Sequence, residues 1–514
     1  MSLPELDQRD DDELIETILA AAGRRDLEAM AVAAAEVSEM TRNWATHIPW
    51  DEFDSLDETT LDEVVADLTQ MWEPVNLQVD ADEEYALDKN AYDFYRPVGR
   101  NLMTRTEEFH GWVEARRRTE TWQYSRTLEA APNSVAQITN DIGRRTRGIN
   151  FNSQDYLSFN THPAIREAAT KAMRDYGPHS AGSPMVLGNT RISDELEASL
   201  GELVRAEQVT LFPTGWAAGF GAMAGLVRQE DHVLIDRLAH SCLQQGARAT
   251  TRNVVRYEHL NVDEVRRHLV DIRRRDSRNG ILVVTDGLFS VDADWPDLVT
   301  LQRVCREHDA TLLVDVAHDL GSMGTGGTGV LGMQDVLGDI DIVMGAFSKT
   351  FCSNGGFVAS ASPALKQYLK MFGGSHFFSN ALSPVQTAVV LEASKIIRST
   401  EGDLLRSRLH TAVTALRDEL TGHGLTCMGE PSPIVPLLIG NEKLARIANR
   451  LLFDRGVLAF MVEFPVTPTG SSRFRLQVQA NHEPDEARAA AKMIAEAITD
   501  ARTYLSSAFG STQR

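Results

Sequence analysis

The stretch DIVMGAFSKTFCSNGG, residues 341–356, decides the fold, because in it a short apolar strand runs into a loop of small residues around one lysine. The apolar residues of Asp341–Met344 predict a buried strand, and the glycines on either side of Lys349 predict a tight loop after it. Strands that end in small and polar residues are typical of α/β proteins, so similar strands are expected elsewhere in the chain.

Four earlier stretches have the same form, each a short apolar run followed directly by small or polar residues: Val209–Phe212, Val233–Ile235, Ile281–Thr285 and Thr311–Val314. Helical stretches separate them, and this alternation predicts βαβ units around a mostly parallel, buried sheet. In open α/β sheets, ligands bind outside the carboxyl ends of the strands. The five strand ends therefore predict one binding site.

Changes in composition and in the pattern of apolar residues predict three regions along the chain. Residues 1–130 form an acidic helical N-terminal extension, with helices at Asp12–Met40 and Leu61–Trp72 and a loop at Gln78–Glu84. Residues 131–400 form the large α/β domain, and residues 401–514 form a smaller α+β domain. Its expected elements are Asp403–Leu420, Ile434–Leu438, Glu442–Phe453, Arg473–Val478 and Pro484–Tyr504.

Composition excludes several classes of protein. The 514 residues carry 51 Lys and Arg against 73 Asp and Glu, a formal charge of −22, which disfavours nucleic acid and anionic membranes as partners. The four cysteines lie far apart without a CxxC motif, so neither disulfides nor a metal site is expected. The acidic N-terminus lacks a signal-peptide pattern and no apolar run could span a membrane, which predicts a cytoplasmic protein.

Two strand ends carry the residues of greatest chemical interest. Lys349 has the small neighbours that an amine needs to form an imine with a bulky ring, although such a lysine is more often simply solvated. Asp315 could pair with a protonated pyridine nitrogen, or it could cap the next helix. His318, close behind it, could equally be a core histidine.

Two further strand ends suit a flat, phosphorylated ligand. Thr214, Gly215 and Trp216 open a helix directly after a strand, where backbone N–H groups and the helix dipole attract phosphate; the alternative is a structural turn. His240 could stack on an aromatic ring, although a single histidine at a strand end is weak support.

Taken in order, these motifs resemble the α-oxoamine synthase family of fold-type I pyridoxal-phosphate enzymes, which includes 8-amino-7-oxononanoate synthase and serine palmitoyltransferase. The resemblance covers roughly residues 150–501 and rests on several motifs in one order. They are Asn152–Leu157 with the N-Y-L pattern, Asp236–Gly246 with D-x₃-H-x₅-G, Phe289–Asp294, Asp315–His318, the lysine loop Gly345–Gly356 and the arginine segment Thr467–Arg475.

The resemblance implies a role for each matching residue. Lys349 would hold pyridoxal 5′-phosphate as a Schiff base and move the substrate's α-proton, while Asp315 would pair with the pyridine nitrogen. His318 would lie near the phenolic oxygen of the ring, and His240 would stack on its face. The remaining assignments are Thr214, Gly215, Trp216, Ser290 and Ser348 on the cofactor, Ser379 on the phosphate of the partner subunit in a homodimer, and Arg473 with Asn152 on the amino acid.

The implied activity is that of a biosynthetic acyltransferase: decarboxylative condensation of an amino acid with an acyl thioester of CoA or an acyl carrier protein, giving an α-amino ketone. Departures from the family pattern at Pro184, Ser193, Ala346 and Cys352 leave the substrates open. The alternative in the same fold is an aminotransferase or another carbanion reaction.

The N-terminal region has a separate set of interpretations. Ser55 lies in Asp54-Ser55-Leu56, which resembles the D-S-L of acyl carrier proteins, so the region could be a carrier or partner-interaction module. The tripeptide is common and its surroundings match poorly. An acidic helical extension is therefore preferred.

Overall fold

The chain divides into two compact units, Met1–Ala86 and Leu87–Arg514. The computed structural model describes residues 77–509, with side chains from residue 83 to residue 508. The helices predicted at Asp12–Met40 and Leu61–Trp72, and Ser55 between them, lie outside the described residues. The features below belong to the second unit, except for the first part of one helix.

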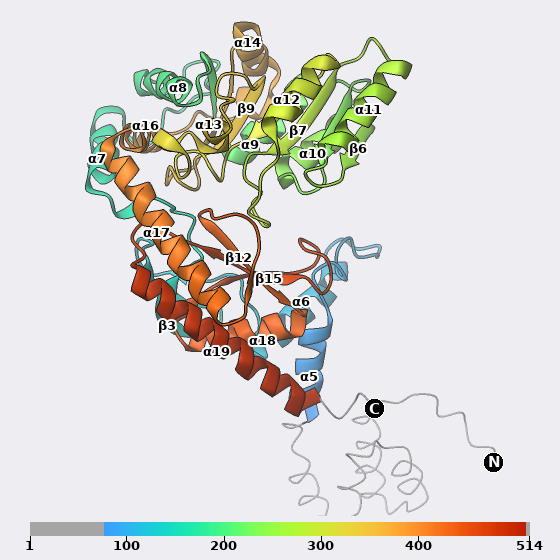
Figure 1. Cartoon of the computed structure of the whole chain (residues 1–514), viewed down its shortest axis with the longest axis vertical. Helices are drawn as coiled ribbons and strands as arrows, with labels where there is room; N and C mark the ends of the chain where they lie inside the picture. Colours follow the sequence, from blue (N-terminus) through green and yellow to red (C-terminus); the bar gives the residue numbers. More distant parts are fainter. Residues whose placement is uncertain (1–76, 510–514) are drawn as a thin grey trace, which may run out of the picture. The chain divides into compact units, whose positions relative to one another are not determined.

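A seven-stranded sheet forms the centre of the large domain, as the sequence predicts (Figure 1). Only β10 runs antiparallel to its neighbours; the other four pairings are parallel, so the predicted mostly parallel sheet is confirmed. In spatial order the strands are β4 (Gln208–Phe212), β10 (Gly356–Ser360), β9 (Ile342–Ala346), β8 (Thr311–Asp315), β7 (Ile281–Asp286), β5 (His232–Asp236) and β6 (Asn253–Tyr257). All five predicted strands are present, with ends that differ by at most two residues.

Helices cover both faces of this sheet, because alternate strand residues point to opposite sides. On β7, Leu282 and Val284 join one apolar cluster, and Val283 joins the other. The first cluster includes residues of α9 (Gly215–Leu226), α10 (Ser241–Thr250) and α14 (Pro363–Phe372). The second includes residues of α7 (Pro163–Tyr176), α8 (Arg191–Val204), α11 (Val262–Arg275), α12 (Leu298–Glu307), α13 (Gly329–Met333) and α16 (Pro384–Ile397).

The C-terminal part of the chain forms three helices and one small sheet, close to the predicted elements, and adds one strand to a second small sheet whose other strands lie within residues 127–150. The helices are α17 (Thr400–Gly422), α18 (Glu442–Asp454) and α19 (Pro484–Phe509). One sheet has the order β11 (Thr426–Cys427), β12 (Ile434–Gly440), β15 (Ser472–Gln477), β14 (Phe460–Val462). In the other, β1 (Thr127–Leu128), β2 (Val135–Thr139) and β3 (Arg145–Asn150) continue into β13 (Val457–Leu458).

The loop predicted at Gln78–Glu84 is wrong, because Leu77–Asp88 is a helix, α5. The stretch contains Ala, Leu and Glu, which are good helix formers and outweigh its acidic character. The C-terminal end is held by packing: Leu87 is buried, and its carbonyl accepts a 2.6 Å hydrogen bond from Nη1 of Arg446.

A buried ion triad joins α6 (Glu107–Arg118) to the small domain. Glu463 accepts from Nη1 of Arg116 at 3.1 Å and from Nε of Arg446 at 2.8 Å, and all three side chains are at most 5% exposed. Two guanidinium groups share one carboxylate, so removal of that carboxylate would leave the buried charge of Arg116 without its ion-pair partner.

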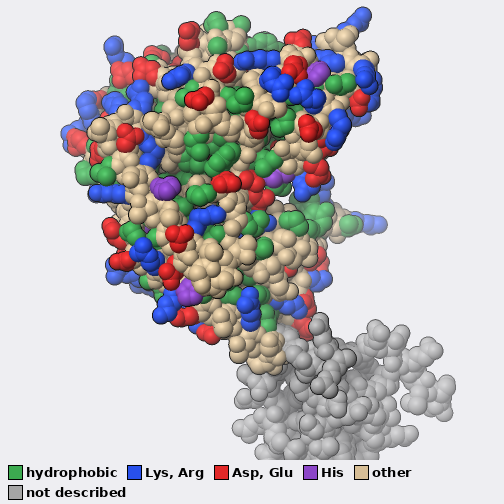
Figure 2. All heavy atoms as spheres, viewed as in Figure 1, with side chains coloured by type: hydrophobic (Ala, Val, Ile, Leu, Met, Phe, Trp, Pro, Cys, Tyr) green, Lys and Arg blue, Asp and Glu red, His purple; other side chains and the backbone are tan. Residues whose placement is uncertain are grey.

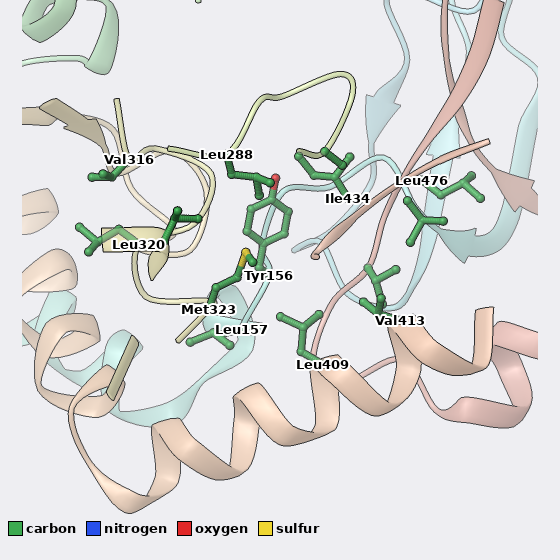
Figure 3. Close-up of a cluster of buried hydrophobic side chains, with 14 of the residues drawn as sticks. Tyr156, Leu157, Leu288, Val316, Leu320, Met323, Leu409, Val413, Ile434 and Leu476 are labelled. Carbon is green, nitrogen blue, oxygen red and sulfur yellow. The ribbon is translucent and has the colours of Figure 1, made fainter. Parts of the chain in front are cut away.

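Tyr156 belongs to the apolar contact between the large and small domains. Figure 3 shows its ring beside Leu288 and Met323 of the large domain, with Leu409 on α17 facing the same cluster. The core is therefore continuous across the two domains.

Acidic and basic side chains are interspersed on the face of the molecule seen in Figure 2. Within residues 77–509, the helices are each too short or too polar to cross a membrane.

Replacement of Glu463 by Gln should destabilise the chain by about 3–5 kcal/mol, because it removes the carboxylate that pairs with the buried guanidinium groups of Arg116 and Arg446. Urea unfolding followed by circular dichroism measures the loss. Lys395→Ala is the matched control: Lys395 pairs with Glu392 on the surface, and its loss should leave the unfolding midpoint unchanged. An unchanged midpoint in Glu463→Gln would contradict the role given to the triad.

Candidate active site

Strand register brings the predicted residues to one edge of the central sheet. Asp315 at the end of β8 pairs in register with Asp286 of β7 on one side and with Met344 of β9 on the other. On the far side of β9, Ala346 lies opposite Gly356 of β10. The carboxyl ends of β7, β8 and β9 therefore meet at this edge, together with the amino end of the antiparallel strand β10.

A cavity of ≈ 190 Å³ opens at this edge, and most of the predicted cofactor residues line it. They are Thr214, Gly215, Trp216, His240, Asp315, His318, Ser348 and Lys349. These residues come from four separate strand ends, so the fold collects into one cavity what the sequence spreads over 136 positions, from 214 to 349. The other lining residues include Asp286, which follows a predicted strand without a predicted role, and Leu288 and Asn354.

Lys349 is 8% exposed, and its surroundings favour the neutral amine. Burial lowers the pKa of Lys349; Asp315 opposes this shift, and the guanidinium of Arg475 adds to it. A neutral amine has a free lone pair, so a desolvated lysine is a better nucleophile than a solvated one.

Two carboxyl groups lie side by side at the floor of the cavity. Asp315 accepts the backbone N–H of Ala317 at 2.9 Å. Burial and the neighbouring charge of Asp315 raise the pKa of Asp286 well above its usual range, which favours its protonated form. Asp286 therefore adds a carboxyl group without adding a second negative charge beside Asp315.

The N-terminus of α9 forms another wall. The side chain of Thr214 caps the helix by accepting from the N–H of Ala217 at 2.9 Å. A Cβ on Gly215 would lie 2.3 Å from the Cβ of Ala346, so only glycine lets this turn pack against β9. The close approach places the start of the helix, with its N–H groups and positive dipole end, at the cavity, where a phosphate group fits.

His240 contributes an imidazole whose orientation is set by its neighbours. Its Nδ1 accepts the backbone N–H of Cys242 at 3.3 Å and lies 2.9 Å from the Cys242 sulfur. Burial lowers the pKa of His240, and with Nδ1 accepting, the neutral ring carries its proton on Nε2. The ring meets Trp216 edge to face, with centroids 6.3 Å apart.

His318 is neutral and held by a tyrosine that the sequence did not single out. Burial, with the nearby charge of Lys349, lowers the pKa of His318 well below its usual range. Its Nδ1 lies 2.9 Å from the hydroxyl of Tyr156, and burial raises the pKa of that hydroxyl, which therefore stays protonated. Tyr156 lies within the N-Y-L segment, so a signal was present in the sequence without a role attached to it.

Four predicted site residues lie away from this cavity. Asn152 lines a second cavity of ≈ 550 Å³ that shares Ser348 and Lys349 with the first. Ser290 contributes its carbonyl oxygen to Arg475, and Ser379 lines neither cavity. Arg473 is buried and forms an ion pair with Asp292.

Arg475, two residues after Arg473, has a guanidinium nitrogen that is available to bind a carboxylate. It is buried, its Nε donates to the carbonyl of Ser290, and its Nη2 has no hydrogen-bond partner among the described residues. Its charge also acts on Lys349, His240 and His318. Residues two apart on a strand share a face, so the sequence Arg-Phe-Arg could not distinguish the two arginines.

The cavity lining fits the cofactor that the sequence resemblance implies. Pyridoxal phosphate needs an amine for its aldehyde, a carboxylate for its ring nitrogen, donors for its phosphate and a flat partner for its ring. Lys349, Asp315, the start of α9 and His240 offer these groups around one space.

Comparison with known proteins agrees with this description. The family model of aminotransferase class I and II matches residues 146–494. Among curated relatives, the 8-amino-7-oxononanoate synthase of Geobacter metallireducens is 35% identical over 67% of this chain and 87% of its own. The serine palmitoyltransferase of Sphingobacterium spiritivorum is 32% identical over 71% of this chain and 89% of its own. A solved serine palmitoyltransferase of S. paucimobilis with a bound PLP–myriocin aldimine is 24% identical, with a TM-score of 0.73, and covers 79% of this chain and 100% of that one.

The fold and site are those of a fold-type I pyridoxal-phosphate transferase. The chain belongs to the aminotransferase class I and II family and, within it, to the α-oxoamine synthases. This confirms the predicted fold class, the cofactor and the reaction class, which is carbon–carbon bond formation between an amino acid and an acyl thioester.

Replacement of Lys349 by Ala should abolish the absorbance at ~420 nm that pyridoxal phosphate shows when it is bound to a lysine amine. The spectrum of the purified protein after incubation with the cofactor and gel filtration tests this. Lys366→Ala provides the control, because Lys366 pairs with Glu197 away from the cavity and its loss should leave the band intact. A band that survives in Lys349→Ala would remove the assignment of Lys349.

Proposed function

We propose that this enzyme condenses an amino acid with an acyl thioester in the cavity around Lys349, with Arg475 as the group that binds the amino-acid carboxylate. The observation that carries the proposal is the unpaired Nη2 of buried Arg475, whose charge acts on Lys349 beside the cavity that Lys349 and Asp315 line. An unpaired buried guanidinium N–H costs free energy until a ligand satisfies it, and a carboxylate does so with a charge-assisted hydrogen bond.

Each residue has a task that follows from its surroundings. Pyridoxal phosphate, when bound, supplies an electron sink for the carbanion formed at the substrate's α-carbon. Asp315, whose carboxylate is buried and lines the cavity, would pair with the ring nitrogen of the cofactor and keep that nitrogen protonated. Lys349, whose pKa is lowered by burial, accepts the α-proton as a neutral amine.

The overall bond changes are those of a decarboxylative condensation. A carbon–carbon bond forms between the α-carbon and the thioester carbonyl carbon, and the thiol leaves with a proton. The amino-acid carboxylate is lost as CO₂, which leaves an α-amino ketone. His240 lines the cavity, and with Nδ1 accepting from Cys242 its Nε2 proton is available to donate a hydrogen bond to an oxygen of the substrate or cofactor.

In this proposal Arg473 does not bind the substrate, although its position in the arginine segment suggests that it would. Its guanidinium is already paired with Asp292, so a substrate carboxylate would have to displace that partner. Arg475 needs no such exchange at Nη2. The substrate-binding role expected for Arg473 therefore passes to Arg475.

Arg475→Ala should raise the KM for the amino acid by about 100-fold, because it removes a charged hydrogen-bond donor to a buried carboxylate. Steady-state kinetics with varied amino acid measure this. Arg475→Lys should recover little of the lost affinity for the amino acid, because an ammonium group cannot reproduce the planar contact of a guanidinium group. A larger KM effect in Arg473→Ala than in Arg475→Ala would reverse the assignment.

The reaction itself is tested by product balance. Wild-type enzyme with an amino acid and an acyl thioester should release CO₂ and free thiol in equal amounts, since one condensation yields one of each. The aminotransferase alternative would consume the amino acid and form an oxo acid without thiol release. Comparison of acyl-CoA with an acyl carrier thioester as donor identifies the carrier in the same assay.

A homodimer completes the proposal. Ser379 lies next to Phe378, which is 86% exposed, and Leu187, in the loop held against this segment, is 84% exposed. The hydroxyl of Ser183 donates to the carbonyl of Phe377 at 2.6 Å and so joins the two loops. A second copy would cover this apolar surface, and sedimentation velocity decides between one copy and two.

A further inference from the structure

A short turn at residues 289–294 holds both buried arginines of β15. The carbonyl of Ser290 accepts from Arg475, and the carboxylate of Asp292 pairs with Arg473. The turn closes on itself, because the N–H of Phe289 donates to the carbonyl of Asp294 at 2.9 Å and the N–H of Ala293 donates to Phe289 at 3.0 Å. Whatever positions this turn therefore positions the two guanidinium groups.

His259, two residues after the end of β6, links this turn to the central sheet. Its Nδ1 lies 3.0 Å from Oδ1 of Asp236, and its Nε2 lies 3.1 Å from Oδ2 of Asp294. Asp236, at the end of β5, is fully buried and also accepts the backbone N–H groups of Leu238 and Leu260. The ring meets Phe289 edge to face at 4.4 Å, so it contacts both ends of the turn.

The imidazole of His259 is doubly protonated, because each ring nitrogen faces a carboxylate and must donate. Burial disfavours the charge, but hydrogen bonds to Asp236 and Asp294 raise the pKa of His259 to about 9. The other charged groups near the ring are Asp292, on the same turn, and Arg473, which pairs with it. With both nitrogens engaged, the ring has no lone pair to offer a metal ion.

We propose that His259 is a positioning residue for amino-acid binding: it ties the 289–294 turn to the fixed end of β5 and so holds Arg475 where a carboxylate can reach it. The inference rests on the proposed function, since it assumes that Arg475 binds the substrate. The chain of contacts runs from Asp236 through His259 and Asp294 to Ser290, and crosses from the large domain to the small domain at Arg475.

His259→Gln should weaken binding of the amino acid about tenfold, with kcat changed much less, because a displaced turn misplaces Arg475 without touching Lys349. Spectral titration of the cofactor-loaded enzyme gives the dissociation constant, and steady-state kinetics give KM and kcat. The absorbance of the bound cofactor should be unchanged, which shows that the site itself remains assembled.

The matched control is His232→Gln. His232 begins β5, whereas Asp236 ends it, and His232 also makes a histidine–carboxylate contact, 2.9 Å from Nε2 to Asp276. It lies at the opposite edge of the sheet from the cavity. This variant should bind the amino acid as the wild type does.

The pH dependence separates positioning by charge from simple packing. His259 is charged below its pKa of about 9, so its contribution is complete at lower pH and is lost as the pH rises through 9. The ratio of wild-type to His259→Gln affinity should therefore be about tenfold at neutral pH and approach one above pH 9. The substrate's own amine titrates in the same way in both measurements, so its effect cancels in the ratio.

Asp294→Asn is the second variant, should His259→Gln fail to fold. It keeps the imidazole and Asp236 but removes one of the carboxylates that raise the pKa, so the alkaline loss of affinity should move to lower pH. Wild-type affinity in a folded His259→Gln, or a ratio that stays constant with pH, would overturn the inference. A wild-type enzyme whose spectrum does not respond to amino acids would instead overturn the proposed function.

Discussion

Lys349 and Asp315 are buried together at the carboxyl edge of a parallel sheet, and the rest of the site depends on this shared burial. In water the lysine would be fully protonated and the carboxylate would act only weakly on it. In the cavity, burial shifts the amine toward its neutral form while Asp315 partly offsets the shift. The same exclusion of water makes the contribution of each nearby group larger, from the carboxyl group of Asp286 to the guanidinium of Arg475.

Small residues make that burial possible. Gly215 can contact β9 only without a Cβ, and the resulting fit brings the start of α9 to the cavity. Cys352, where the family often has glycine, adopts φ of 45°, the left-handed region that favours glycine. Its N–H donates to the carbonyl of Lys349 at 2.9 Å, so the loop keeps the glycine conformation at some cost in strain.

The two domains are linked by polar as well as apolar contacts. Tyr156 joins the buried cluster of Figure 3 and also contacts His318 in the cavity. Arg475 belongs to a strand of the small domain, but the carbonyl that orients it belongs to the large domain. Under the proposed function, substrate binding at Arg475 depends on the relative position of the two domains, and the 289–294 turn is the part of the large domain that contacts Arg475.

The sequence by itself determined the strand and helix pattern, the edge of the sheet where ligands bind, and the identities of Lys349, Asp315, His318 and His240 as candidates. These follow from local patterns, since apolar runs define strands and parallel strands put their carboxyl ends together. The tertiary structure decided what depends on distance and burial. It separated Arg475 from Arg473, which share one strand face, because only one of them has a carboxylate partner. It also showed the interactions of Tyr156, Asp286 and His259. Each of these residues interacts with a residue far away in the sequence: His318, Asp315 and Asp294, respectively.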